Sequence, residues 1–303
     1  MSNNLRGCLY AVMSSASYGV NAFALLLYDH GVTTETVLFY RYFFAVLFLL
    51  GLMLIRRESL RLSLREFAII CPMGILFAFS SLSLFESYKY LGASLSATAL
   101  FVYPALVAII MWLVFRESPG RVTLFAIPAV FFGIVLLDWQ GIWAGTSSPL
   151  GLVIVFSSAL SYAIYMVVVQ KSRLARMSSL KLSFYSLFFG WFLFIAKTDF
   201  CADVQILHSA TDWSIVVMLA VFPSLVSLAT MATAIRLVGS TATAVLGAFE
   251  PLTSVLIGIS LLGERPPLVS FVGMVIILLS VTAVIAQRQL NTYVSKLLRH
   301  CPH

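Results

Sequence analysis

Charged residues are scarce in this chain. Only 10% of its 303 residues are Asp, Glu, Lys or Arg, whereas 61% are hydrophobic and the mean hydropathy is +1.00. A water-soluble domain of this size cannot cover its surface with so few polar groups. The deficit of charge therefore excludes an ordinary soluble enzyme or binding domain and indicates a protein embedded in a lipid bilayer.

Motifs for ATP hydrolysis and metal binding are missing as well. No Gly-x-x-x-x-Gly-Lys stretch occurs in the sequence, so we expect no ATP hydrolysis by this chain. The four histidines lie outside the predicted membrane spans, and the four cysteines form neither a metal-binding pattern nor a same-side pair. We therefore predict no catalytic residues, no metal and no cofactor. The net charge of +7 is interpreted as a signal of orientation and lipid contact, with no nucleic-acid partner.

Long apolar runs fill nearly the whole chain. Strands of a membrane barrel would be short and alternating, so these runs predict helices. Ten runs are long enough to span a bilayer, at 7–28, 34–55, 67–88, 92–115, 121–138, 150–170, 179–197, 213–235, 240–262 and 268–286. The predicted fold class is an all-α membrane protein with ten transmembrane helices.

The two halves of the sequence repeat each other. Six residues recur without a gap 147 positions later: Gly92, Ala97, Pro104, Ile110, Glu117 and Pro119 match Gly239, Ala244, Pro251, Ile257, Glu264 and Pro266. Five spans per repeat place the halves in opposite membrane orientations, as in many secondary transporters. We predict a first five-helix repeat at 1–146, a second at 147–287, and a tail at 288–303. The tail is either an interfacial helix or a disordered end.

The basic residues predict the orientation. With a cytoplasmic N-terminus, 15 of the 19 Lys and Arg residues fall in inside segments. Only Lys89, Lys197 and Arg265 fall outside, and Arg41 lies within the second span. This bias predicts that both termini are cytoplasmic.

Three stretches resemble a known family. The segments YPALVAIIMWLVFRESP and EPLTSVLIGISLLGERP, together with FYRYFF in the second span, resemble EamA-like members of the drug/metabolite transporter superfamily. The resemblance covers the whole chain. It implies a multi-pass carrier of the bacterial inner membrane, most often an exporter of amino acids, other metabolites or toxic compounds. The first copy departs from the signature at Arg116, where the second has Gly263, so we expect that loop to pack differently.

Polar residues form a matched stripe in the first span of each half. Tyr18 and Asn21, with two serines, share one helical face, and Tyr162 and Tyr165 do the same in the sixth span at a spacing of 144. We predict that these four residues line a central cavity that binds the substrate. The alternative is that they hold neighbouring helices together.

Two charged residues lie within spans. Glu250 precedes Pro251 and is either a substrate or proton site, or a neutral acid bonded to carbonyls that the proline frees. Tyr103 occupies the matching position in the first half and is included in the predicted substrate site. Arg41 is either a counter-ion for a substrate carboxylate or, by the favoured interpretation, snorkels outward with its stem on Tyr40 and Tyr42.

Other charged residues are interpreted as structural. Glu86 and Lys89 are spaced to form an ion pair at the end of the third span. Glu117 and Glu264 lie at span ends beside prolines and are interpreted as terminators rather than as chemistry.

Taken together, the sequence predicts a carrier that exports small organic solutes, such as amino acids or related metabolites, by alternating access. Its partners are the solute and the lipid bilayer, and coupling to protons remains open. One alternative is exchange of a nucleotide-linked metabolite, which needs basic residues in the cavity. Another is a membrane-embedded lipid-modifying enzyme, which needs a cluster of carboxylates or a histidine at one interface.

Overall fold

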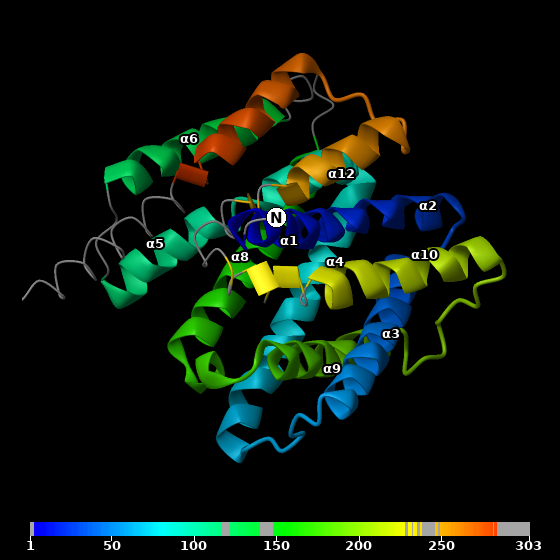
Figure 1. Cartoon of the computed structure of the whole chain (residues 1–303). Coiled ribbons are helices and arrows are strands. Elements are labelled where there is room, and N and C mark those ends of the chain that lie inside the picture. Colours follow the sequence, from blue (N-terminus) through cyan, green and yellow to red (C-terminus); the bar gives the residue numbers. More distant parts are fainter. Residues whose placement is uncertain are drawn as a thin grey trace, which may run out of the picture.

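The computed structural model describes residues 3–116, 121–137, 139, 148–227, 230–231, 233–234, 237, 246–247, 249–280 and 282–283. Over these residues the chain is helical and contains no strand, which confirms the predicted all-α class. Figure 1 shows the helices in colours that follow the sequence. They are α1 (Asn3–Gly19), η1 (Val20–Phe23), α2 (Ala24–Asp29), α3 (Thr34–Ile55), α4 (Leu64–Leu100), α5 (Tyr103–Phe115), α6 (Arg121–Leu137), α8 (Pro149–Lys171), η2 (Arg173–Arg176), α9 (Ser179–Lys197), α10 (Ala210–Ala220), η3 (Val221–Val226), α12 (Phe249–Ser260) and an unlabelled helix at Leu268–Ser280.

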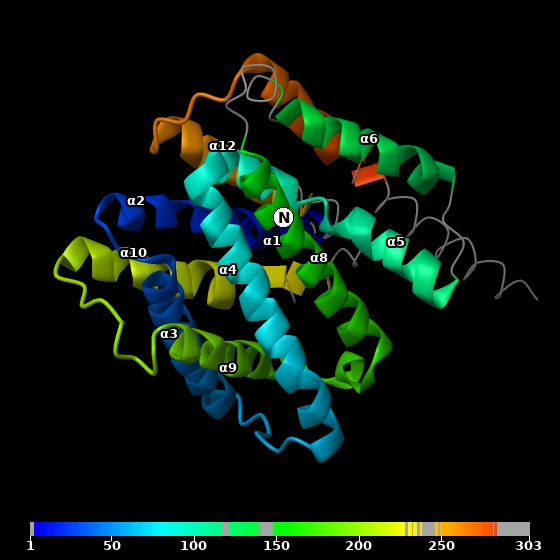
Figure 2. The ribbon, with the colours of Figure 1, turned by 180° about the vertical axis from the view of Figure 1, so that it is seen from behind.

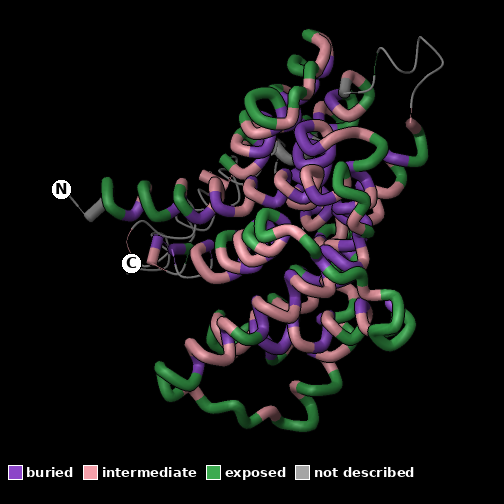
Figure 3. The backbone as a smooth tube through the Cα atoms, turned by 90° about the vertical axis from the view of Figure 1, so that its right-hand side faces the viewer, coloured by how far each residue is buried: buried purple, intermediate pink, exposed green. Residues whose placement is uncertain are grey.

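Several helices are long and apolar enough to cross a bilayer. Within the described residues there are five, and four further apolar helices are shorter, among them Phe249–Ser260 and Leu268–Ser280. Leucine and phenylalanine side chains cover the outside, as at Leu64 and Phe125, which are 83% and 81% exposed. In Figure 3 the buried residues gather where the helices cross, and exposed ones follow the outer faces. The chain is therefore a multi-pass membrane protein, whose count of ten spans stays a prediction.

The predicted spans at 67–88 and 92–115 are divided differently in the structure. Helix α4 continues through Leu100, with a break at Gly92, whose φ of 75° suits a residue without a Cβ atom. A turn at Phe101 and Val102 then precedes α5, because Pro104 near its start cannot donate to the preceding turn. The fourth predicted span is thus two helical pieces rather than one. Pro223 similarly lies in the π-helical stretch η3, next to α10.

The repeat is visible in matching contacts. Ser14 donates to the carbonyl of Ser227 at 2.8 Å, and Ser158 donates to the carbonyl of Ser80 at 2.6 Å. The sequence repeat relates Ser14 to Ser158 and Ser80 to Ser227, so these are two copies of one contact. Helix α6 and its counterpart Leu268–Ser280 also run side by side (Figures 1 and 2).

The two copies of the signature loop begin with the same backbone conformation. Arg116 has φ 54° and its repeat counterpart Gly263 has φ 68°, so both adopt the left-handed conformation. That the two loops pack differently stays a prediction, because residues 117–120 lie outside the described residues. Arg116 adopts a conformation that costs a residue with a Cβ atom about 1–2 kcal/mol.

Loops of the two halves meet at both ends of the molecule. At one end Ser178 donates to Glu58 at 2.5 Å, and Lys181 donates to the carbonyl of Arg61. At the other end the Thr33 amide donates to the side chain of Gln205 at 2.7 Å. These pairings place together the loops that the charge count assigns to the same side of the membrane.

Candidate functional site

Three of the predicted site residues form an aromatic cluster between α5 and α8. The ring centroids of Tyr103 and Tyr162 lie 4.7 Å apart in a T-shaped contact, and those of Tyr162 and Tyr165 lie 6.2 Å apart. Phe77 from α4 completes the cluster at 5.1 Å from Tyr165. Tyr18 from α1 lies within electrostatic range of Tyr162 and Tyr165. The structure therefore brings the tyrosines of the predicted site together.

Repeat-related residues face each other in this cluster. Tyr18 corresponds to Tyr162, and Tyr103 corresponds to Glu250. Each pair is within electrostatic range, and Glu250 also interacts with Tyr18 and Tyr162. Residues that are exchanged by the repeat can meet in this way only near the axis that relates the halves. The four residues thus lie where the two repeats join.

Glu250 lies in the first turn of α12, packed against α1. A Cβ atom placed on Gly19 would lie only 2.8 Å from the Glu250 carbonyl oxygen, so this glycine allows the two helices to approach closely. The Glu250 amide donates to the Gly247 carbonyl at 3.0 Å, which satisfies the acceptor that Pro251 cannot reach. Among the described residues, the Glu250 side chain accepts and donates no hydrogen bond. No bond from a neutral acid to a freed carbonyl is therefore formed among the described residues.

Arg41 points into the protein. It lies on the buried face of α3 with Leu38 and Tyr42, and only 5% of it is exposed. Its guanidinium carbon is 5.2 Å from the centroid of the Phe85 ring in α4. Tyr40 points elsewhere and donates to the Gln205 carbonyl. The favoured prediction of outward snorkelling on Tyr40 and Tyr42 is wrong, because the face of α3 that carries Arg41 packs against α4.

Several polar groups around this region lack partners. The Oδ1 atom of Asn21 is buried without a hydrogen-bond partner, and Asn21 lies in η1, one turn beyond Tyr18. Tyr18, Tyr103 and Tyr162 are partly buried, and their hydroxyls make no hydrogen bond within the described part of the chain. Buried polar groups in proteins are usually paired, so a cluster of unpaired groups is a candidate binding site. Isolated neutral cases, such as Ser96 Oγ, occur elsewhere in the chain.

The sequence reasoning missed Tyr88 and Phe85 in α4. Tyr88 is buried and lies within electrostatic range of both Arg41 and Glu250. It stacks on Phe85 with ring centroids 5.3 Å apart, so the Phe85 ring contacts both Tyr88 and the Arg41 guanidinium. Their spacing of three residues places Phe85 and Tyr88 on one helical face. That spacing was the available signal.

Glu264 has the structural role predicted for it. It accepts hydrogen bonds from the Ala93 amide at 2.5 Å, from the Ser94 amide at 3.1 Å and from the Ser94 hydroxyl. These donors begin the helical segment that follows the break at Gly92. The carboxylate therefore caps a helix of the first repeat from the end of the second. Its counterpart Glu117 lies outside the described residues.

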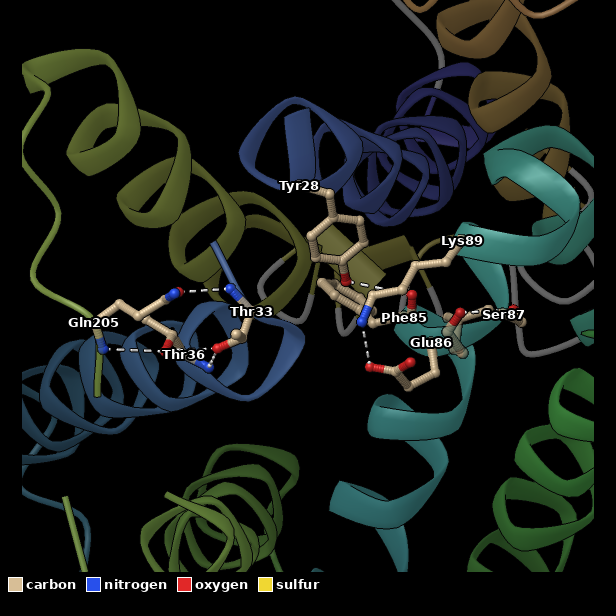
Figure 4. A network of polar contacts seen from close by, with 9 residues as sticks. Tyr28, Thr33, Thr36, Phe85, Glu86, Ser87, Lys89 and Gln205 are labelled. Carbon is tan, nitrogen blue, oxygen red and sulfur yellow. Dashed lines mark hydrogen bonds and ion pairs between the residues drawn. The ribbon is translucent and has the colours of Figure 1, made fainter. Parts of the chain in front are cut away.

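A separate polar network lies at one end of the helices (Figure 4). Lys89 and Glu86 form the predicted ion pair at 2.8 Å, which is confirmed, and the Lys89 ammonium lies 5.4 Å from the centroid of the Tyr28 ring. Nearby, a pocket of about 820 Å³ is lined by residues of both halves, and His30 pairs with Asp212 at its edge at 2.6 Å. None of the residues predicted to bind substrate lines this pocket.

Comparisons with known proteins identify the family. No curated protein matches the chain. Among the 28 solved chains that match it, one crystal structure covers 93% of this chain and 98% of its own length, with a TM-score of 0.63 and 17% identity, and so shows a shared fold. The profile of the EamA-like transporter family matches twice, at residues 5–138 and 149–286. Two matches that span nearly the whole sequence establish that this chain belongs to the EamA-like transporter family.

Proposed function

We propose that this chain exports a small organic solute by alternating access, through a site between its two repeats. Amphipathic solutes, including amino acids and related metabolites, suit the tyrosine and polar lining best. The observation that carries the proposal is the contact between Tyr103 of the first repeat and Tyr162 of the second, whose ring centroids lie 4.7 Å apart, with Tyr18 and Glu250 within electrostatic range of both. Carriers with inverted repeats bind substrate at the repeat interface near the middle of the membrane, where helices are broken. The turn at Phe101 and Val102 before Pro104 and the turn at Gly247 before Pro251 support that geometry here.

Counterflow in liposomes that contain only this protein tests the transport function. Vesicles loaded with a panel of unlabelled amino acids and related metabolites are diluted into a trace of the labelled solute. A carrier accumulates label transiently inside when the loaded solute is a substrate. Protein-free vesicles and vesicles with heat-unfolded protein give the background. Absence of counterflow for every solute of the panel would oppose the proposal.

We further propose that the chain lies in a bacterial inner membrane with ten spans, inverted repeats at 1–146 and 147–287, and both termini, including the tail 288–303, in the cytoplasm. The concentration of basic residues on one side supports this orientation. In a variant that keeps only Cys201 among its cysteines, an impermeant thiol reagent should label intact cells. A cysteine at Ser59 should react only after permeabilisation. The reverse pattern would invert the orientation.

Coupling to protons would act through Glu250, because it is the carboxylate placed between the repeats. Glu250→Gln should retain counterflow, since its side chain holds no structural hydrogen bond in the described residues. If the same variant loses its response to a pH gradient, Glu250 carries the proton. If it still concentrates solute against a proton gradient, the residue has no coupling role and transport is facilitative or driven otherwise.

A further inference from the structure

Arg41 is a buried cation that has no anionic partner among the described residues. Only 5% of the residue is exposed, and among the described residues its guanidinium forms no ion pair and no hydrogen bond. Its described contact is the face of Phe85 at 5.2 Å. An unpaired charge in a low-dielectric interior is costly, and a ring face compensates only part of that cost. The arrangement indicates that an anion from outside the chain completes the site.

In the second repeat, the polar groups at the equivalent positions are hydrogen-bonded to each other. The second spans of the two halves share the pattern Phe-Tyr-x-x-Phe-Phe at 39–44 and 184–189, which relates Arg41 to Ser186, and the matching first spans relate Asn21 to Tyr165. In the second half the Tyr165 hydroxyl and Ser186 Oγ lie 2.9 Å apart and satisfy each other. In the first half Asn21 Oδ1 has no partner, and Arg41 is bonded to no described residue. At these two equivalent positions, the groups without a described partner therefore lie in the first half.

The surroundings of Arg41 supply further donors for an anion. Tyr18, Tyr42 and Tyr88 lie within electrostatic range of the guanidinium, from α1, α3 and α4 respectively. The hydroxyl of Tyr42 is bonded to Ser81 at 2.8 Å, whereas those of Tyr18 and Tyr88 are bonded to no described residue. A guanidinium binds a carboxylate through two parallel hydrogen bonds, and free phenols can donate to the same oxygens. One described cation suits a single carboxylate better than a phosphate with two charges.

We propose that Arg41 is the subsite that takes the carboxylate of the transported solute, and that Phe85 positions its guanidinium. The inference rests on the proposed transport function and adds to it the charged group of the solute and the half that recognises it. Phe85 acts through Arg41 and is a positioning residue. Solutes in which an amide replaces the carboxylate are then poor substrates, even when the rest of the molecule is unchanged.

Binding tests the subsite without requiring transport. Benzoate and benzamide have the same shape and differ in charge, so we use them as probes of the purified protein in detergent. Benzoate should raise the thermal unfolding midpoint of the wild type and of Arg65→Gln, a matched control at an exposed arginine. It should not raise that of Arg41→Gln, and benzamide should act on none of the three proteins. Equal stabilisation of wild type and Arg41→Gln by benzoate would overturn the subsite.

Transport tests the same claim with matched pairs of solutes. L-phenylalanine and L-leucine are compared with their amides as competitors of counterflow. The acids should compete at least about tenfold better than the amides in the wild type, because a site built for a charged group rejects an analogue that lacks it. Arg41→Gln should lose this ratio. Phe85→Leu should reduce it, and Phe85→Tyr should restore it, which a role in folding alone would not produce.

The two proposals fail in different ways. Counterflow in which acids and amides compete equally, and which Arg41→Gln leaves unchanged, contradicts the subsite while transport stands. Stabilisation by benzoate that depends on Arg41, in a protein without counterflow for any solute, supports the anion site and contradicts the proposed transport function.

Discussion

The two halves of the molecule differ in the hydrogen bonding of one pair of equivalent positions. In the second half Tyr165 and Ser186 are both buried and join by a hydrogen bond of 2.9 Å. In the first half the equivalent Asn21 and Arg41 are just as buried, but neither the amide oxygen nor the guanidinium is paired with a described residue. A duplicated scaffold can thus keep its fold in both halves while the polar groups at one pair of equivalent positions are paired in one half and unpaired in the other.

A second comparison involves two carboxylates at opposite ends of one helix. Glu250 in the first turn of α12 makes no side-chain hydrogen bond within the described residues. Glu264, just beyond the end of α12, accepts three from Ala93 and Ser94. Buried polar groups stabilise a fold when they are satisfied and cost free energy when they are not. The contrast indicates a structural role for Glu264 and supports the proposed solute or proton role of Glu250.

The largest effect is expected from making the first half resemble the second. The double variant Asn21→Tyr, Arg41→Ser introduces the residue types of the hydrogen-bonded pair Tyr165 and Ser186, and it removes the buried cation. Counterflow of carboxylate solutes should fall by about tenfold or more, because the anion partner is lost. The thermal unfolding midpoint should rise, because an unpaired buried charge is removed. A variant that transports normally, or one that is folded but less stable, would contradict the inferred difference between the two halves.

The two carboxylates should differ clearly in stability. Glu264→Ala leaves the amides of Ala93 and Ser94 without their acceptor, so it should reduce the free energy of unfolding by about 1–3 kcal/mol. Glu250→Gln removes no described hydrogen bond and should not destabilise the protein. Thermal or denaturant unfolding in detergent measures both. If Glu250→Gln proves the more destabilising of the two, the assignment of roles is reversed.

The smallest effect is expected from a substitution in the hydrogen-bonded pair Tyr165 and Ser186 of the second half. Ser186→Ala removes one hydrogen bond to the Tyr165 hydroxyl, which should cost about 0.5–1.5 kcal/mol of unfolding free energy. The preference for acids over amides in counterflow should not change, because Arg41 is untouched. Loss of that preference in Ser186→Ala would show that both halves recognise the charged group.

Much of the fold could be predicted from local pattern. Uninterrupted apolar runs predicted 34–55 and 179–197, and the structure has α3 and α9 at those residues. The fourth predicted span was wrong because Gly92 and Pro104 each change the backbone within an apolar run, which hydropathy does not detect. The repeat itself was predicted correctly, since it depends on matching residues at a nearly constant spacing of 144 to 147 positions.

The candidate site could be predicted only in part. The helical stripe identified Tyr18 and Tyr162 because periodicity reports which residues share a face. It does not report which helix that face meets. Arg41 lies on Phe85, which is 44 positions away in the sequence, and Glu264 caps residues that are 170 and 171 positions away. Such partners depend on how helices from both repeats pack, which one sequence does not specify.

Protection of introduced cysteines by solute tests the central claim most directly. In a protein without native cysteines, Tyr103→Cys and Tyr162→Cys are compared with Leu160→Cys and Ile164→Cys, two exposed positions on the other side of α8 from Tyr162. We predict that a small soluble thiol reagent modifies the two tyrosine positions, that a transported solute protects both, and that the two control positions show neither effect. Equal modification at all four positions without protection by solute would contradict a binding site between the repeats.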